Sequence, residues 1–485
     1  MGLLKASDLE MSVRRSLAWT YSAQALSFFV TFASTIIVAR LVSPRDFGIF
    51  AMANAVTSVM TVVVSFGLAK YLIREVTVCQ SLLRLLFTVN VITSILFVVL
   101  ITTGALAAEY VFSSVEVAQF LFVFAVFPLI AMMEFIPSAL CLREMRFGVI
   151  AAINVVRAGV LAATTVVLAF KGYAYMSFAW AQILAWIVTV VCYNVVVWRP
   201  DVWRPRFKGM QSVLRFGAQM VGVGAFGQLT TRGGEIALGS MLGLTTLGLY
   251  TRASGLPTSL YSIIFGAGST VIYSRLSQDL REKGEIHETY LHFMRLLLGC
   301  LWPMLFGLAV VAPPLIHTLY GANWQASAIP LAFVAVSYAV IIGSGMTSEV
   351  FILRRETHVQ VKIEGIRAVG GFLFFAGGAM ISLPAAAAGK LIESIFAFFL
   401  YRKPMARFID GPAGVLRRVY LEGIMVSVSA ILPSFILMCW TRWSPLTPPI
   451  AVVSSIVIGG VMWAAILFKR QHPIATEVTR LLKQM

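Results

Sequence analysis

Five charged side chains lie inside long apolar segments of this sequence, where each could bind a charged ligand. They are Arg157, Arg232, Glu235, Arg252 and Lys390. An ionisable group inside a membrane is costly, and it usually faces a water-filled cavity or a partner of opposite charge. Cations match or outnumber acids in these segments, and guanidinium binds phosphate through planar, bidentate hydrogen bonds. These residues therefore predict a site for an anionic ligand such as a phosphate or pyrophosphate.

Arg157 differs from the paired residues in having no nearby acid in the sequence, and from Arg252 in lying deeper in its apolar segment. It lies near the middle of its apolar segment, and no acidic residue occurs three or four positions away. Arg232 and Glu235 are spaced i, i+3, as are Lys390 and Glu393, so each pair could instead neutralise itself on one helix face. Arg157 is therefore expected to face a water-filled cavity.

Three charges near the ends of the apolar segments have an alternative explanation. Arg252, Arg367 and Glu349 lie nearer the segment ends, where long side chains can reach the water at a membrane interface. Glu134 belongs to the apolar segment before that of Arg157, and the two side chains are predicted to face each other.

The elements that carry these residues are predicted to be membrane-spanning helices. Of the 485 residues, 59% are hydrophobic and 12% are charged, whereas a soluble domain has about 25% charged residues. A helix needs about 20 apolar residues to cross a bilayer, and these runs lack the alternation of a β-barrel. The predicted fold class is therefore an all-α integral membrane protein with about fourteen transmembrane helices. The predicted spans are 16–39, 47–69, 85–108, 117–140, 148–170, 173–198, 213–242, 247–273, 295–318, 326–350, 363–383, 385–401, 421–440 and 447–468.

The basic residues between these spans predict the topology. Of the 38 Lys and Arg residues, 30 fall in the segments on one side, 4 in those on the other side and 4 within spans. Because cytoplasmic loops are rich in Lys and Arg, both termini are predicted to be cytoplasmic. Tyr320 and Trp324 then lie at the outer interface, where aromatic side chains often anchor a membrane protein.

Composition and motifs exclude several functional classes. The net charge of +17 lies in short loops, where it fits anionic lipid headgroups better than nucleic acid. The five cysteines and five histidines are scattered without metal-ligand spacing, and no phosphate loop, GxSxG or HExxH motif occurs. We therefore expect no cofactor, no metal, no nucleic-acid partner and no catalytic residues.

Two pairs of short segments indicate an internal repeat. FGIFAMA at 47–53 resembles LGLYTRA at 247–253, and INVVRA at 153–158 resembles IEGIRA at 363–368, which aligns Arg157 with Arg367. Both pairs relate spans 1–6 to spans 7–12. Because six spans form an even number, the two halves have the same orientation, an arrangement that suits transport by alternating access.

The spans and the repeat together predict the organisation of the chain. Two pseudo-symmetric six-helix bundles are followed by two additional helices. The predicted parts are a cytoplasmic lead at 1–15, the first bundle at 16–198, a linker at 199–212, the second bundle at 213–402, a linker at 403–420, the additional helices at 421–468 and a cytoplasmic tail at 469–485.

Several segments resemble the Wzx-type oligosaccharide flippases, a polysaccharide-transporter branch of the multidrug/oligosaccharidyl-lipid/polysaccharide exporter superfamily. The opening run of these segments is the most specific, and the sequence departs from a frequent family pattern at Gly233–Glu235. The segments are ARLVSPRDFGIFAMA at 39–53, SFGL at 65–68, REMRF at 143–147, TRGGE at 231–235, LGLYTRA at 247–253 and LYGANW at 319–324.

The resemblance implies a flippase that moves a polyprenyl-pyrophosphate-linked oligosaccharide to the outer leaflet of a bacterial inner membrane by alternating access. Arg157, Arg232 and Arg252 would contact the pyrophosphate or acidic sugars, and Lys390 is a further candidate. Glu235 would orient Arg232 or respond to protonation. A polymerase and glycosyltransferases of the same surface-polysaccharide or exopolysaccharide pathway would be partners. The alternatives are a multidrug or cation exporter of the same fold, a membrane-bound glycan polymerase or ligase, and a passive scaffold.

Overall fold

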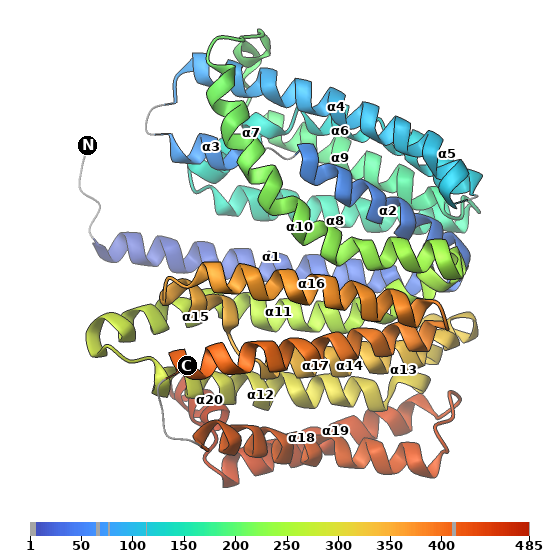
Figure 1. The fold of residues 1–485 in the computed structure, drawn as a ribbon, viewed down its shortest axis with the longest axis vertical. Coiled ribbons are helices and arrows are strands. Elements are labelled where there is room, and N and C mark those ends of the chain that lie inside the picture. The colour runs from blue at the N-terminus through green and yellow to red at the C-terminus, as the bar shows by residue number, and fades with distance from the viewer. Residues whose placement is uncertain (1–5, 65–67, 76–77, 113, 410–413, 485) are drawn as a thin grey trace. The chain divides into compact units, whose positions relative to one another are not determined.

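The computed structural model describes residues 6–64, 68–75, 78–112, 114–409 and 414–484, and every regular element in these ranges is a helix (Figure 1). The chain divides into two compact units, Met1–Ser240 and Met241–Met485. The finer boundaries predicted from the sequence, with linkers at 199–212 and 403–420, remain a prediction.

The first unit contains ten α-helices and one short 3-10 helix in its described residues. The helix α1 packs against α8, and α8 packs against α9. The elements are α1 (Ala6–Leu41), α2 (Pro44–Val64), α3 (Leu68–Arg74), α4 (Gln80–Phe112), α5 (Val115–Phe124), α6 (Phe127–Ala131), α7 (Phe135–Arg143), α8 (Phe147–Phe170), α9 (Met176–Val196), η1 (Pro200–Trp203) and α10 (Met210–Leu242), which ends at the unit boundary.

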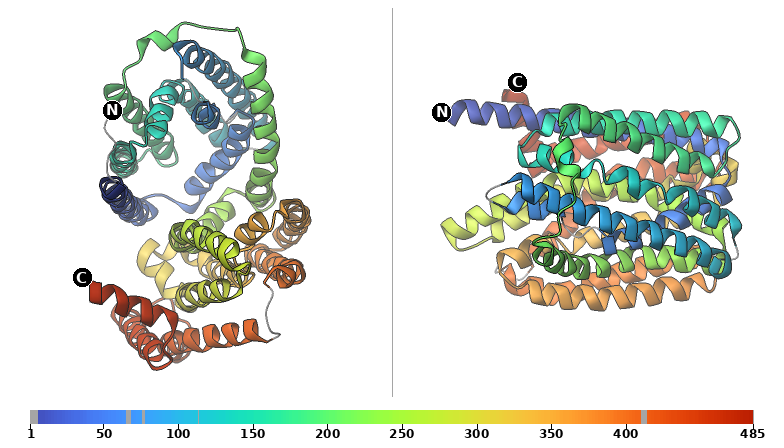
Figure 2. Two further views of the ribbon diagram at one scale, coloured as in Figure 1. Left: turned by 90° about the vertical axis from the view of Figure 1, so that its left-hand side faces the viewer. Right: turned by 90° about the horizontal axis from the view of Figure 1, so that it is seen from above.

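The second unit is also helical throughout its described residues, and Figure 2 shows its helices, coloured yellow-green to red, lying side by side. The elements are α11 (Leu244–Lys283), α12 (His287–Val310), α13 (Ala312–Tyr320), η2 (Ala322–Ser327), α14 (Ala328–Gly343), α15 (Thr347–Leu353), α16 (Thr357–Ala379), α17 (Leu383–Phe408), α18 (Val415–Trp440), α19 (Pro449–Lys469) and α20 (Pro473–Gln484).

The chain is an all-helical membrane protein with several spans. Ten helical segments of the described residues are long and apolar enough to cross a membrane, or eleven if the bent segment from Val115 to Arg143 is one span. Helices occupy all fourteen predicted ranges, but α2, α10 and α16 are not among these ten or eleven. In α16 the charged residues Lys362, Glu364 and Arg367 interrupt the apolar run. The predicted junction at Ser382–Pro384 is confirmed, because Ser382 caps the start of α17 by accepting a hydrogen bond from the amide of Ala385 at 3.3 Å.

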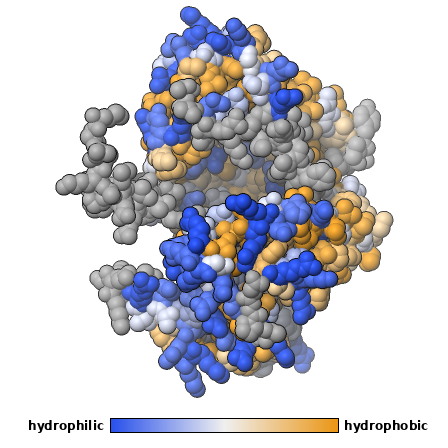
Figure 3. Space-filling model, turned by 60° about the vertical axis from the view of Figure 1, so that its left-hand side comes forward, coloured by the Kyte–Doolittle hydropathy of each residue, from blue (hydrophilic) through white to orange (hydrophobic). Residues whose placement is uncertain are grey.

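Apolar side chains cover the flanks of the helices, as expected for contact with lipid. Ile450 of α19 is 81% exposed, and Figure 3 shows patches of apolar side chains on the surface beside hydrophilic ones. A water-soluble protein would not expose apolar surface on this scale, because doing so opposes the hydrophobic effect.

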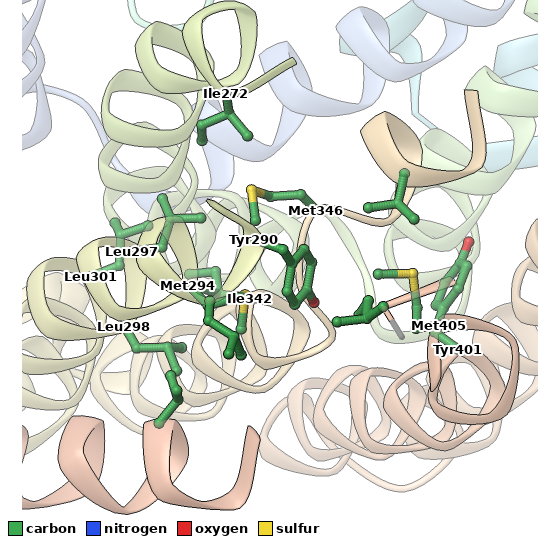
Figure 4. Packing of buried hydrophobic residues seen from close by; sticks show 14 of the residues in the cluster. Ile272, Tyr290, Met294, Leu297, Leu298, Leu301, Ile342, Met346, Tyr401 and Met405 are labelled. Atoms are coloured by element: carbon green, nitrogen blue, oxygen red, sulfur yellow. The ribbon is translucent and has the colours of Figure 1, made fainter. Parts of the chain in front are cut away.

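The core of the second unit lies between α12, α14 and their neighbours. Tyr290, Met294 and Ile342 pack together there (Figure 4). Polar atoms at the edge of this core are satisfied by the backbone: the Trp302 indole donates to the Ala339 carbonyl at 2.8 Å, and the Tyr420 hydroxyl donates to the Gly343 carbonyl at 2.7 Å. These bonds join α12 and α18 to α14, which fixes the helix that precedes α15.

Close contact between α16 and α17 requires small residues. A Cβ atom added at Gly378 would lie 2.3 Å from the Ala385 carbonyl oxygen, and one added at Gly389 would lie 2.3 Å from the Phe374 carbonyl oxygen. A side chain at either position would push the two backbones apart. The glycines thus allow the approach that places the polar side chains of α16 against those of α17.

We expect Gly378→Ala to destabilise the protein by about 1–3 kcal/mol, because the new methyl group meets backbone atoms that cannot move aside. The neighbouring substitution Gly377→Ala is the control, because no atom lies within 4 Å of the added Cβ. Both changes gain the same helix propensity. Thermal unfolding of the two variants in detergent measures the difference, and equal unfolding temperatures would show that this contact is not tight.

Candidate functional site

The fourth predicted span of the first unit is broken, and this break is the centre of the candidate site. The segments Val115–Ala131 and Phe135–Arg143 meet at an angle of 52° (Figure 1). Pro137 explains part of the break, because it has no amide hydrogen to donate to the carbonyl four residues earlier, which belongs to Met133. Glu134 lies at the junction, next to α7.

Two asparagines satisfy the carbonyl groups that the break exposes. Asn90 of α4 donates from Nδ2 to the Met132 carbonyl at 3.1 Å, and Asn194 of α9 donates to the Met133 carbonyl at 3.2 Å. An unpaired carbonyl inside a membrane is costly, so these bonds stabilise the broken conformation. The sequence analysis missed both residues. Each is an asparagine within an apolar span, and another span of the same bundle contains an internal proline. These two features together could have predicted that the asparagines bind carbonyl groups freed by the proline.

Arg157 belongs to α8, which packs against α7. Its guanidinium carbon is 5.2 Å from the centre of the Trp186 ring of α9, in a cation–π contact. The edge of Trp186 packs against Phe127 of α6, with ring centres 5.1 Å apart. Among the described residues, no carboxylate lies within ion-pair distance of Arg157, and Glu134 lies at the start of α7, which packs against α8. The predicted isolation of Arg157 from acids is therefore observed in the structure.

Arg367, which the repeat aligns with Arg157, has a different environment in the second unit. Its Nε donates to Glu393 of α17 at 2.5 Å, and its Nη1 lies 3.4 Å from Glu364 of α16. Lys390 binds the other oxygen of Glu393 at 2.7 Å, and the Tyr401 hydroxyl donates to Glu364 at 2.5 Å. The cluster holds two positive and two negative side chains, so it is neutral as a whole.

This cluster changes the interpretation of two residues. The proposal that Arg367 reaches the membrane interface alone is wrong, because its guanidinium is held by two carboxylates. The predicted pairing of Lys390 with Glu393 is confirmed, and Glu393 is only 3% exposed. The position of Glu393 on α17 could not be linked to Arg367 from spacing along the chain, because the two lie on different helices.

Arg232 and Glu235 form the local ion pair that their spacing predicts. The Arg232 Nη1 and Glu235 Oε2 atoms are 2.8 Å apart on α10. Each side chain is partly buried, at 28% and 14% exposure. Their role in ligand binding remains a prediction, and the carboxylate would have to share the guanidinium with any anionic ligand.

Arg252 is buried between two aromatic rings of the same unit. Its guanidinium carbon lies 5.0 Å from the ring centres of both Tyr320 and Trp324, and the residue is 6% exposed. Ser327 donates a hydrogen bond to the Leu249 carbonyl at 2.9 Å, which also ties η2 to α11. The alternative explanation, in which Arg252 reaches interfacial water, does not agree with this burial. Tyr320 and Trp324 are buried as well, so they pack against Arg252 instead of anchoring an interface.

Glu349 does not reach water either. It begins the short helix α15 and is 9% exposed, and its Oε2 atom has no hydrogen-bond partner among the described residues. The break between α14 and α15 explains the difference, because the separate helix α15 packs against α11, α16 and α17.

The backbone supports the repeat that aligns Arg157 with Arg367. Each arginine follows a turn with a residue in the left-handed region, Met145 at φ 53° and Arg355 at φ 59°, at the same separation along the chain. The two aligned arginines thus occupy equivalent elements, but only Arg367 is paired with carboxylates. In the described residues, no group of three or more His, Cys, Asp or Glu side chains could hold a metal ion.

Comparisons with known proteins identify related sequences. Residues 37–329 match the model of a family described as "Polysaccharide biosynthesis protein". The chain is 21% identical over 334 residues to the succinoglycan biosynthesis transport protein ExoT of Rhizobium meliloti, covering 68% of this chain and 67% of ExoT. It is 22% identical over 280 residues to the teichuronic acid biosynthesis protein TuaB of Bacillus subtilis, and this match spans only 56% of either protein.

Solved structures with the same fold include two transporters. The inward closed conformation of the lipid II flippase MurJ superposes with a TM-score of 0.71 and 13% identity, covering 94% of this chain and 99% of MurJ. A MOP-superfamily transporter from Pyrococcus furiosus superposes with a TM-score of 0.52 and 15% identity, covering 82% and 96%. At these identities the likeness establishes the fold alone.

Proposed function

Because this chain belongs to the polysaccharide biosynthesis protein family, a Wzx-like branch of the MOP transporter superfamily, we propose that it is a flippase for a polyprenyl-pyrophosphate-linked oligosaccharide. Membership of a transporter family excludes the alternative of a glycan polymerase or ligase. The protein is a multi-pass membrane protein of polysaccharide biosynthesis.

The observation that carries the proposal is the environment of Arg157. Inside a membrane, a guanidinium group without a carboxylate partner in the described residues has free capacity to bind an anion. Phosphate and pyrophosphate offer it paired oxygens with matching geometry. A transporter of organic cations would instead need acidic groups without basic neighbours. In the described helices α6 to α9, the only carboxyl group is that of Glu134, and α7 packs against the helix of Arg157.

In the proposed cycle, Arg157 binds the pyrophosphate or an acidic sugar while the polyprenyl tail stays in lipid. Fourteen spans with both termini in the cytoplasm would carry the headgroup from the inner to the outer leaflet of a bacterial inner membrane by alternating access. The polymerase and glycosyltransferases that make and extend the oligosaccharide would be partners.

The other predicted ligand contacts have narrower proposed roles. Arg232 contributes a second guanidinium, which Glu235 orients through the ion pair of 2.8 Å. Arg252 acts as a positioning residue that holds Tyr320 and Trp324. Lys390 balances the charge of Glu393 and is not needed for direct contact with phosphate.

Reconstituted transfer tests the proposal. The purified full-length chain is placed in liposomes whose inner leaflet holds a labelled lipid-linked oligosaccharide, and appearance of the label in the outer leaflet is followed with a membrane-impermeant glycan-modifying enzyme. We expect transfer above that of protein-free liposomes. Transport of organic cations without transfer of the oligosaccharide would instead support the multidrug exporter, and neither activity would support the scaffold.

A further inference from the structure

We propose that Glu134 is an exchangeable counter-ion, which binds Arg157 when the anionic headgroup leaves and gives way when the headgroup returns. The inference rests on the proposed function, because it assigns a role to the group beside the proposed anion site. It adds a second residue to that site and states how the ligand is released.

The first support is the distribution of charge around Arg157. Residues 127–143, 147–170 and 176–196 form α6 to α9, and their only carboxyl group is that of Glu134. The next acid along the chain, Glu144, is already 2.7 Å from Arg146. A competing negative charge at Arg157 can therefore come from Glu134 within these helices, or from a ligand.

The second support is the geometry of the break. Glu134 lies between α6 and α7, and the carbonyl groups of the two residues before it are held by Asn90 and Asn194. These bonds fix the backbone immediately before Glu134. Glu134 lies at the start of α7, which packs against α8, the helix of Arg157, and the two charged groups are not in ion-pair contact in the described residues. The guanidinium is therefore close to a carboxylate and still able to accept another anion.

The third support is the comparison with Arg367. There, Glu393 and Glu364 lie 2.5 and 3.4 Å from the guanidinium, and Lys390 and Tyr401 fix the two carboxylates in turn. That arginine is held in a closed cluster. Carboxylate and phosphate bind guanidinium with the same paired geometry, so a single loosely placed carboxylate can exchange with phosphate where a closed cluster cannot.

The inference predicts opposite effects of Glu134→Gln on binding and on turnover. Without the competing carboxylate, a larger fraction of Arg157 is free, so the Kd of the purified full chain for inorganic pyrophosphate should fall by about tenfold. In reconstituted transfer, KM for the lipid-linked oligosaccharide should fall. The value of kcat should also fall, because no carboxylate then displaces the headgroup from Arg157 when it is released. A purely structural defect would not make binding tighter.

Three controls keep the test specific. Glu109→Gln removes an exposed carboxyl at the end of α4 and should leave Kd, KM and kcat unchanged. Glu134→Asp keeps the charge with a shorter reach and should give intermediate values; it also serves if the Gln variant is unstable. In the Arg157→Gln background, Glu134→Gln should have no further effect on Kd, because the tighter binding of pyrophosphate requires the guanidinium of Arg157.

The outcomes separate this inference from the proposed function. If the wild type transfers the oligosaccharide but Glu134→Gln leaves Kd and kcat unchanged, or weakens binding, the counter-ion role is wrong and the flippase proposal stands. If the wild type neither binds pyrophosphate nor transfers the oligosaccharide, the proposed function fails, and the inference fails with it.

Discussion

Replacing Arg157 with glutamine should reduce transfer of the lipid-linked oligosaccharide by about 100-fold or more, while the protein still inserts and folds. The change removes two charge-assisted hydrogen bonds to phosphate, and losing about 3 kcal/mol of binding corresponds to roughly a hundredfold weaker interaction. Folding should be preserved because, among the described residues, Arg157 has no ion pair to lose and only a cation–π contact with Trp186. Initial rates of transfer in liposomes with equal amounts of protein measure the effect.

Two variants serve as controls for Arg157. Arg157→Lys keeps the charge but loses the planar, bidentate geometry, so we expect an intermediate rate. Arg146→Gln removes an exposed cation between α7 and α8 and should transfer at the wild-type rate. If glutamine at position 157 leaves the rate unchanged, Arg157 does not bind the substrate, and the main support for the flippase proposal is lost.

Replacing Glu393 with alanine should destabilise the second unit by about 3–5 kcal/mol, because the change leaves buried charges without their partner. The carboxylate is almost fully buried and binds Arg367 at 2.5 Å and Lys390 at 2.7 Å. After its removal, two cations would share the single carboxylate of Glu364 inside the apolar part of the bundle. Thermal unfolding in detergent, followed by tryptophan fluorescence, measures the loss.

The matched control is an ion pair at the surface of the same unit. Glu422 lies 3.3 Å from Arg295 and is 43% exposed, so Glu422→Gln should change the stability by at most about 1 kcal/mol. Similar shifts for the two variants would mean that the cluster around Glu393 is hydrated and that its neutrality does not stabilise the fold.

The two aligned arginines explain why the two halves would contribute differently to transport. They occupy equivalent elements, yet Arg367 is neutralised by residues of α16 and α17, whereas Arg157 forms no ion pair with the residues that the structure describes. A repeat fixes the position of a helix but not the chemistry of its neighbours. We infer that the first unit supplies the principal anion contact and that the charges of the second unit hold its own helices together.

The sequence by itself determined the class of the protein, the helical ranges and the internal repeat. These follow from local properties: the length of apolar runs, their lack of alternation, and the side on which Lys and Arg accumulate. It also identified Arg157 as isolated from acids and the pairs Arg232–Glu235 and Lys390–Glu393, because residues three or four positions apart share a helix face.

Only the tertiary structure decided which side chains meet across helices. The contact of Arg367 with Glu393, the burial of Arg252 between Tyr320 and Trp324, and the support of the broken span by Asn194 each join different elements. Spacing along one helix carries no information about such contacts, because they depend on how each helix is rotated and packed against its neighbours. A charge that the sequence places near a membrane interface can therefore be buried in the structure, with its partner supplied by another part of the chain.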